Sequence, residues 1–379
     1  MRFGSVCSGI EAASVAWHGL GWTAAWVSEI EAFPSAVIAA RWPGVENLGD
    51  MTALPERILA RDVEAPDVLV GGTPCQAFSV AGLRGSLSDA RGNLTLTFVR
   101  IANAIDAVRR ADGRAPAWIV WENVPGVLTV ADNAHGAFLG GLVGGDAAIE
   151  PPRGRGWTDA GVVSGPSRCA AWRVLDAQHF GLAQRRRRVF VLARAGAGDW
   201  AAADALLPVI ESVRWHPAPR RKAGQKLAPT IAGCANGGGA NGPGRDIDSV
   251  ESLIPSTGDV AHCLNAGGMG RQDYETETLV AHAFDARQSN VIQCGDLAGP
   301  LDTDGHSVAV ATAMQVRRLT PRECERLQGF PDGYTAIPWR GRPASECPDG
   351  PRYKALGNSM AVPVMRWIGA RIAAIDQAG

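Results

Sequence analysis

One cysteine of the chain stands where α/β proteins place a reactive group. Cys75 lies in GGTPCQAFSVAG, directly after the apolar segment DVLVGG, a pattern that predicts a strand followed by a tight loop. Loops at the carboxyl ends of such strands hold the ligands of open α/β sheets. A lone cysteine is more often a small buried hydrophobe. Pro74 and the flanking glycine and glutamine residues favour a shaped, exposed loop, so we expect a nucleophile.

A glutamate and a run of arginines could form a polar pocket with this cysteine. Glu122 follows the apolar segment AWIVW, and a dry pocket would keep its carboxyl group protonated. Arg185 to Arg188 lie in GLAQRRRRVFV, and guanidinium groups suit oxygen ligands. A phosphate-binding patch is the alternative. Because successive strand residues face opposite sides, two arginines can serve a pocket and two the backbone or surface.

The N-terminal segment FGSVCSGIEAA predicts a loop between a strand and a helix that approaches a ligand through its backbone. Ser8 and Gly9 lie on this loop, and such a site favours a carboxylate. Glu29 comes 20 residues after Gly9, where an acidic residue can bind ribose hydroxyls. Taken alone, this pattern also fits a nicotinamide-dependent dehydrogenase.

Short apolar runs alternate with helical patterns through the first half of the chain. This order predicts βα units, and therefore a mostly parallel sheet with helices on both faces. The segments are RFGSVCS, EAASVAWHGLG, AAWVSEI, FPSAVIAARW, DVLVGG and AWIVWEN, with RRVFVLA following later.

The composition shifts toward glycine and small polar residues after Ala193, and we place a domain boundary near Pro208. Stretches that begin at Ala228 and Ala261 resemble each other, and a weaker echo begins at Ala298. They indicate repeated short hairpins, although independent glycine-rich loops explain them equally well.

Two helices are expected near the C-terminus. Thr320, Pro321 and Glu323 form a helix start with a capping-box pattern. The segment GNSMAVPVMRWIGARIAAI, which begins at Gly357, ends the chain as a helix with a mostly apolar face.

The composition is that of a folded chain of about two domains, with 379 residues, 46% hydrophobic and 20% charged. A net charge of -1 means that any affinity for nucleic acid must come from local basic patches. The eight cysteines and seven histidines show no metal-ligand spacing, so no metal is expected. No segment resembles a membrane span, and we expect a cytoplasmic, nucleoid-associated protein with reduced thiols.

At these residues the chain resembles the DNA cytosine-5 methyltransferase family of bacteria and phages. Pro74, Cys75 and Gln76 match the family's Pro-Cys-Gln motif, and WENVPGVL resembles its Glu-Asn-Val motif. GLAQRRRRVFV resembles its Gln-x-Arg-x-Arg motif, and RRLTPRECERLQGFPD and YKALGNSMAVPV follow in the family's order. Five ordered motifs leave little room for coincidence. The resemblance excludes residues 201–311, where the family keeps its target-recognition region.

The resemblance implies a Rossmann-like α/β sheet that binds S-adenosyl-L-methionine, with helices on both faces, and a smaller, mixed or β-rich target-recognition domain. Residues 1–208 would form the catalytic domain, completed by residues 346–379. Residues 209–345 would form the recognition domain with glycine-rich loops.

The resemblance also implies roles for single residues. Methyl transfer to carbon 5 of a flipped-out cytosine would proceed through a covalent adduct of Cys75, assisted by Glu122, Arg186 and Arg188. The residues implied for the cofactor are Ser8, Gly9, Ile10, Glu29, Ile30, Asp50, Met51, Pro74, Leu94, Asn358 and Ser359. The residues implied for DNA and the target base are Gln76, Ser79, Gln184, Arg185 and Arg187.

One position departs from the family pattern. Glu11, Ala12 and Ala13 follow Ile10 where further glycine is common, which bears on the backbone of the cofactor loop.

Three other functions stay open at this point. An RNA cytosine methyltransferase would share the same motifs, although the long insert between Arg188 and Arg317 favours DNA. A DNA-binding protein without activity would need none of Cys75, Glu122 and Arg188. A dehydrogenase would leave the Cys75 loop without a role. Duplex DNA is the expected partner, with a cognate restriction endonuclease encoded nearby as a further option, and a monomer suffices. The recognition sequence and the base that removes the carbon 5 proton are not identified by the sequence.

Overall fold

The computed structural model describes residues 1–74, 94–129, 132–151, 156–196, 200–206, 283–285, 292–293, 308–312 and 315–378. The expected nucleophile Cys75 lies outside the described residues, as do Gln76 and Ser79. The stretches that begin at Ala228 and Ala261 also lie outside them, so the expected repeats are not described.

A seven-stranded sheet organises the first half of the chain, in the order β2-β1-β3-β4-β7-β6-β5. Neighbours among β2, β1, β3 and β4 run parallel, whereas β7, β6 and β5 continue the sheet in antiparallel pairs. The strands are β1 Arg2–Val6, β2 Thr23–Ser28, β3 Val68–Gly71, β4 Trp118–Asn123, β5 Ala160–Ser164, β6 Arg168–Asp176 and β7 Arg187–Ala195. The sheet is therefore mixed, where the sequence had indicated a mostly parallel one. The strand β7 pairs antiparallel with β4, and β6 and β5, which were not expected, extend the sheet in further antiparallel pairs.

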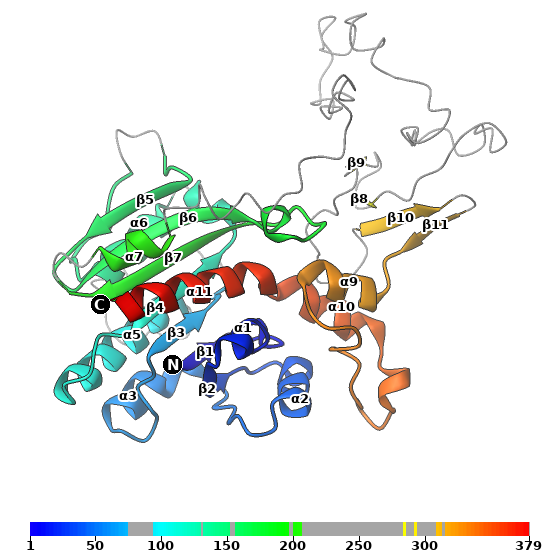
Figure 1. Cartoon of the computed structure of the whole chain (residues 1–379), viewed down its shortest axis with the longest axis horizontal. Helices are drawn as coiled ribbons and strands as arrows, with labels where there is room; N and C mark the ends of the chain where they lie inside the picture. The colour runs from blue at the N-terminus through cyan, green and yellow to red at the C-terminus, as the bar shows by residue number, and fades with distance from the viewer. Residues whose placement is uncertain are drawn as a thin grey trace, which may run out of the picture.

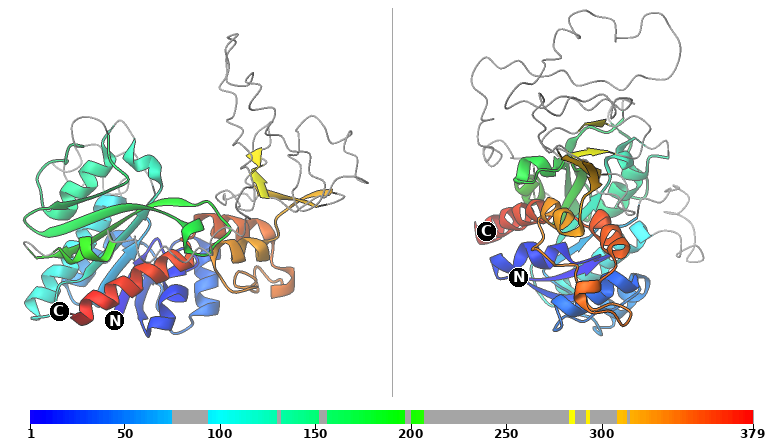
Figure 2. Two further views of the ribbon diagram at one scale, coloured as in Figure 1. Left: turned by 45° about the horizontal axis from the view of Figure 1, so that its top comes forward. Right: turned by 90° about the vertical axis from the view of Figure 1, so that its right-hand side faces the viewer.

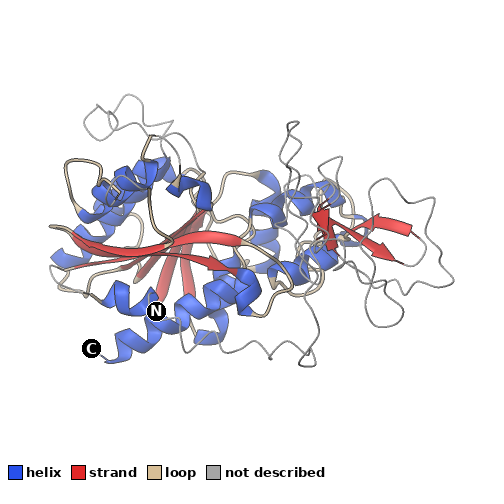
Figure 3. Cartoon of the chain, turned by 90° about the horizontal axis from the view of Figure 1, so that it is seen from above, coloured by secondary structure: helices blue, strands red, loops and turns tan. Residues whose placement is uncertain are grey.

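Helices cover both faces of this sheet, as the alternating pattern predicts (Figures 1 and 3). On one face lie α1, α7 and α11, and on the other lie α3, α5 and α6. The bounds are α1 Ala12–Trp17, α2 Ala32–Arg41, α3 Leu54–Leu59, α5 Leu94–Ala111, α6 Ala134–Val143, α7 Ala201–Leu206, α9 Pro321–Gln328, α10 Asp349–Asn358 and α11 Val362–Ala378.

The last helix packs into the core on one face of the seven-stranded sheet. In Figure 1, α11 runs across the sheet beside α1, although the two are far apart in the sequence. Trp17 is fully buried, and its indole nitrogen donates a hydrogen bond of 2.7 Å to the carbonyl oxygen of Met365. The same indole packs edge-on against Phe3, with 4.9 Å between ring centroids. Such aromatic pairs stabilise a fold beyond the area that they bury. Trp17 therefore links α11, through its hydrogen bond, to Phe3 of β1.

Helix α9 begins at the residue that the sequence indicates. Thr320 caps α9, and its side chain and that of Glu323 each accept from the other's backbone N–H in a capping box. A second, smaller sheet lies beside α9 and α10 at one end of the molecule (Figure 2). Its order is β11-β10-β8-β9, all antiparallel. Its strands are β8 Ala283–Asp285, β9 Ile292–Gln293, β10 Val308–Thr312 and β11 Gln315–Arg318.

Candidate active site

Glu122 and Arg188 meet at the carboxyl end of β4. Every residue of β4 is buried, and the strand lies between β3 and the antiparallel β7. Glu122 is opposite Phe190 in the register, so Arg188, two residues before Phe190, projects from the same face of the sheet. The Nε atom of Arg188 lies 3.2 Å from Oε1 of Glu122. The pair brings an acid and a fixed cation together at one point of the sheet.

The chain that leads into the Cys75 loop lies directly beside this pair. A Cβ atom added to Gly72 would lie 3.1 Å from Oε2 of Glu122 and 3.2 Å from Cε of Met360. Only a residue without a side chain leaves both neighbours undisturbed. Pro74, at the end of this described segment, is exposed.

Thr73 is held on three sides. Its hydroxyl group lies 2.9 Å from the Thr95 hydroxyl and accepts a hydrogen bond of 2.9 Å from the Trp121 indole. Its carbonyl oxygen accepts from the Asn123 amide at 3.1 Å. A buried polar group that is fully bonded has one preferred position. Sequence reasoning missed these supporting residues, although Trp121 and Asn123 lie in the WENV motif that it identified.

The arginine run alternates between buried and exposed residues, as strand geometry predicts. Arg186 is 2% exposed and Gln184 is fully buried, whereas Arg185 and Arg187 are exposed. Arg187 pairs with the exposed Asp159 at 2.8 Å, on the opposite face of β7 from Arg188. The run therefore offers two groups to the interior and two to solvent.

Arg186 joins β7 to the segment between α10 and α11. Its Nη2 atom donates to the carbonyl oxygens of Gly357 at 3.1 Å and Ser359 at 2.7 Å. Its Nε and Nη1 atoms have no hydrogen-bond partner among the described residues. Burial, and then the nearby charge of Arg188, lower the pKa of Arg186 to about 9. Ser359 is buried and the neighbouring Asn358 is exposed.

The loop after β1 has an unusual backbone. Cys7, Gly9 and Glu11 all have positive φ angles, of 50°, 56° and 65°. Alternating left-handed residues turn backbone N–H groups toward a common concave side, a geometry that suits anions. The Ser8 hydroxyl donates to the carbonyl oxygen of Ser5 at 3.0 Å, and Ile10 is fully buried. The Ser8 hydrogen bond and the buried Ile10 side chain therefore fix the centre of the loop against the protein interior.

Glu29, at the end of β2, connects this loop to the next one. Its carboxylate accepts hydrogen bonds of 2.7 Å from the backbone N–H groups of Gly9 and Glu31. Burial is the largest cause that raises the pKa of Glu29. The next residue, Ile30, exposes 74% of its surface, which is unusual for a large apolar side chain. An acid and an apolar surface thus stand together beside the loop.

The Cys7–Glu11 loop and Glu29 form two parts of a cradle, and the segment before α3 forms the third part. Asp50 is exposed, and its carboxylate accepts from the Thr52 N–H at 2.9 Å. Met51 is buried, with its sulfur 3.6 Å from Sγ of Cys7. Burial raises the pKa of the Cys7 thiol to about 12, which keeps it protonated. Leu94, at the start of α5, is half-buried.

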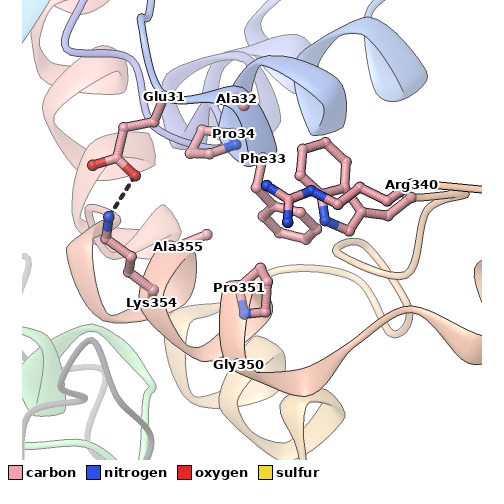
Figure 4. A pocket seen from close by; sticks show the side chains of 10 residues that line it. Glu31, Ala32, Phe33, Pro34, Arg340, Gly350, Pro351, Lys354 and Ala355 are labelled. Carbon is pink, nitrogen blue, oxygen red and sulfur yellow. Dashed lines mark hydrogen bonds and ion pairs between the residues drawn. The ribbon is translucent and has the colours of Figure 1, made fainter.

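A pocket of about 490 Å³ adjoins this cradle between α2 and α10, and sequence reasoning did not identify it. Glu31 and Lys354 form an ion pair of 2.8 Å across its edge (Figure 4). Phe33 and Trp339 pack edge-on with centroids 5.2 Å apart, and Arg340 lies over the Trp339 ring. The pocket therefore joins the segment after Glu29 to the helix that ends at Asn358.

In the part of the chain that the structure describes, no group of three or more His, Cys, Asp or Glu side chains could hold a metal ion. No described helix is long and apolar enough to cross a membrane.

A family model described as C-5 cytosine-specific DNA methylase matches residues 1–138 and 259–374. The chain is 44% identical over 459 aligned residues to the DNA N-6-adenine-methyltransferase of Escherichia phage P1, covering 98% of this chain and 61% of that protein. It therefore spans about three fifths of the length of that relative.

A second relative is the Type II methyltransferase M.HpaII of Haemophilus parainfluenzae, 27% identical over 331 residues, with 86% of this chain and 76% of that protein covered. Among solved structures, a DNMT2 mutant of Spodoptera frugiperda matches with a TM-score of 0.52 and 16% identity. That match covers 98% of this chain and 99% of the other, and at this identity it shows the fold alone.

Proposed function

The chain belongs to the family of C-5 cytosine-specific DNA methylases, and we propose that it transfers a methyl group to carbon 5 of cytosine in a short duplex DNA sequence. The observation that supports this most is the Glu122–Arg188 pair beside Gly72, on the segment that leads into Cys75. Addition to cytosine needs an acid, a cation and a thiol. The acid and the cation lie at one strand end, beside the segment that leads to the Cys75 thiol.

S-adenosyl-L-methionine is the cofactor of this family, and the described residues fit it. The Cys7–Glu11 loop offers a concave backbone, and Gly9 has no atom within 4 Å of where a Cβ would lie. Glu29 can accept from ribose hydroxyls, and the exposed Ile30 offers an apolar surface to a purine ring. When bound, the cofactor supplies an electrophilic methyl group. Asp50, Met51, Pro74, Leu94, Asn358 and Ser359 are proposed to complete this site.

Carbon 5 of cytosine is a weak nucleophile until a group adds to carbon 6. In the proposed reaction, the Cys75 thiolate forms a bond to carbon 6, and the ring electrons move toward carbon 5 and nitrogen 3. A protonated Glu122 donates a hydrogen bond to nitrogen 3, while Arg188 holds the carbonyl oxygen of the base. After carbon 5 has gained the methyl group, a base removes its proton. The thiolate then leaves carbon 6, which restores the ring.

The Glu122–Arg188 pair is proposed to separate when the flipped base enters, because the carbonyl oxygen of cytosine takes over Arg188 and the base displaces water from the pocket.

The DNA is proposed to lie over the exposed arginines. Arg185 and Arg187 face solvent next to the buried Arg186, so they can contact phosphates while their neighbours serve the pocket. Gln76, Ser79 and Gln184 are proposed to contact the base or its surroundings. We also propose that residues 1–208 and 346–379 form the catalytic domain. The hydrogen bonds from Arg186 to the Gly357–Ser359 segment support that division.

The name of the phage P1 relative points to a different base, adenine at nitrogen 6. The alignment covers 61% of that protein, so its name can describe a part that this chain does not match. Transfer to an exocyclic nitrogen, which has its own lone pair, needs no addition to the ring and hence no Cys75.

One experiment separates these substrates. The protein and its Cys75→Ser variant would be expressed in cells that lack their own DNA methylation, and nucleosides from DNA and tRNA would be quantified by mass spectrometry. We expect 5-methylcytosine in DNA for the parent protein alone, with bisulfite sequencing giving its sequence context. N6-methyladenine from both proteins would overturn the proposal, and 5-methylcytosine confined to tRNA would replace its substrate.

A further inference from the structure

Glu11 is a buried acid that the proposed reaction does not use. It ends the Cys7–Glu11 loop, where the sequence departs from the family's glycine-rich form. Its side chain lies inside the molecule, 1% exposed. An acidic residue is rarely buried without a specific reason.

The backbone of Glu11 is strained in a way that glycine would avoid. Its φ and ψ angles are 65° and 60°, in the left-handed region that is unfavourable for a residue with a side chain. A glycine would avoid this strain, so a favourable interaction of the Glu11 side chain must compensate for it.

The Glu11 carboxyl group offers a helix cap. Oε1 accepts hydrogen bonds from the Ser14 backbone N–H at 3.1 Å and from the Ser14 hydroxyl at 3.2 Å. The Glu11 backbone N–H donates to the carbonyl oxygen of Ser8 at 2.9 Å. These bonds close the turn that contains Gly9 and tie it to the start of α1.

The surroundings of Glu11 oppose a negative charge. Glu29, at the end of β2, is a second acid that binds the same loop through the Gly9 N–H. Tyr334, from the segment after α9, donates its hydroxyl proton to the carbonyl oxygen of Ile10 at 2.9 Å. The guanidinium of Arg41 lies 5.5 Å from the Tyr334 ring, and among the described residues no ion pair joins any cation to Glu11.

Polar neighbours offset only part of this effect. The Ser5 hydroxyl of β1 favours the charged form, but Oε2 of Glu11 has no hydrogen-bond partner among the described residues. Burial is the largest cause that raises the pKa of Glu11 to about 7. Cys7, at the start of the loop, and Asp50, whose charge acts on Cys7, add no positive charge.

We infer that Glu11 is a positioning residue for the cofactor, and that it holds the Cys7–Glu11 loop in its binding conformation as a neutral carboxylic acid. The inference rests on the proposed function, because S-adenosyl-L-methionine is the group that the loop receives. When Glu11 loses its proton, the new charge repels the Glu29 carboxylate. This repulsion weakens the hydrogen bond that Glu29 accepts from the Gly9 N–H, and the Gly9 turn is held less firmly.

Calorimetric titration with S-adenosyl-L-methionine and with S-adenosylhomocysteine tests this directly. The wild type, Glu11→Gln and Glu11→Ala would be compared at about pH 6 and about pH 8.5, on either side of the expected transition. Glutamine keeps the cap acceptor and cannot ionise, so it imitates the neutral acid. Thermal unfolding curves would show that each variant is folded.

We expect the wild type to lose about fivefold or more in affinity between the two pH values, with Glu11→Gln losing much less. Ionisation of the ligand itself affects both proteins equally, so the difference isolates Glu11. Glu11→Ala should bind about tenfold more weakly at both pH values, because the cap is lost.

Parallel pH profiles for the wild type and Glu11→Gln would overturn the neutral-acid role. Unchanged affinity in Glu11→Ala would overturn the positioning role. A wild-type protein that binds neither ligand at either pH would overturn the proposed function itself, together with this inference. Binding with the expected profile, but methylation of another base, would leave the inference standing and correct only the substrate.

Discussion

Arg188 and Glu122 form an ion pair of 3.2 Å on one face of the central sheet, with side chains 15% and 11% exposed. Their strands are antiparallel neighbours, and Glu122 is opposite Phe190 in the register. The pair therefore depends on the alignment of β4 with β7 and needs no loop to form it. Both charges are largely withdrawn from water, so the loss of either leaves the other poorly compensated.

Replacing Arg188 should slow methyl transfer itself. For Arg188→Gln we expect the single-turnover rate at saturating DNA and cofactor to fall about 100-fold, since one charged donor to the base is lost. The rate is measured by transfer of a labelled methyl group to duplex DNA.

Arg187→Gln is the matched comparison, because Arg187 is exposed on the opposite face of β7 and pairs with the exposed Asp159. It should raise the DNA concentration needed for half-saturation and reduce the salt dependence of binding, with the saturated rate within about twofold of the parent. Equal loss of saturated rate in both variants would contradict the role of Arg188.

A single methyl group at Gly72 should disturb the site without unfolding the protein. The new Cβ of Gly72→Ala would lie 3.1 Å from Oε2 of Glu122 and 3.2 Å from Cε of Met360, so one neighbour must move. We expect the saturated rate to fall about tenfold or more, since small displacements at a reacting centre are costly.

Gly44→Ala serves as the control, because no atom lies within 4 Å of its added Cβ and its φ angle is not positive. Its rate and melting temperature should match those of the parent. If Gly72→Ala is equally silent, Glu122 has more freedom than the geometry indicates.

Removing Arg186 should loosen the segment between α10 and α11. Arg186→Ala leaves the carbonyl oxygens of Gly357 and Ser359 without this donor and opens a cavity. The free energy of unfolding should fall by about 2 kcal/mol or more, measured by urea denaturation.

The exposed neighbour offers the control for this variant. Arg185→Ala should change stability by no more than about 0.5 kcal/mol. Cofactor affinity should fall in Arg186→Ala alone, since Asn358 and Ser359 belong to the displaced segment. Indistinguishable urea curves for the two variants would rule out a stabilising tether.

Glu11 should make stability depend on pH. Burial raises its folded-state pKa to about 7, from 4.5 as the ordinary value, so the folded state binds the proton more tightly than the unfolded state. Its contribution is fully present below pH 4.5 and is lost as the pH rises to about 7. The loss amounts to at most about 3 kcal/mol.

Glu11→Gln removes this dependence, because the amide cannot ionise. The wild type should therefore lose stability relative to Glu11→Gln as the pH rises from about 5 to about 8, as followed by denaturant unfolding at each pH. A constant difference between the two proteins over that interval would mean that Glu11 does not titrate there.

Much of the first half of the fold could be predicted from the sequence. The short apolar runs at RFGSV and WIVWEN form β1 and β4, and the Thr320 capping box begins α9 as expected. These features depend on residues close together in the chain, where periodicity and capping chemistry act. The β5–β6 hairpin was missed. Its edge strand β5 has no uninterrupted apolar face, and three of its five residues are exposed.

The sequence by itself determined which groups the chain offers: a cysteine after a strand, an acid after a buried strand, alternating arginines, and a glycine loop followed by an acid. Only the tertiary structure decided which of these meet. The Glu122–Arg188 pair depends on the register between β4 and β7, and the two bonds of Arg186 to Gly357 and Ser359 join residues 171 and 173 positions apart. The left-handed, buried state of Glu11 depends on α1, on β2 and on the segment after α9. Contacts of this kind arise from packing between distant segments, which local sequence pattern does not encode.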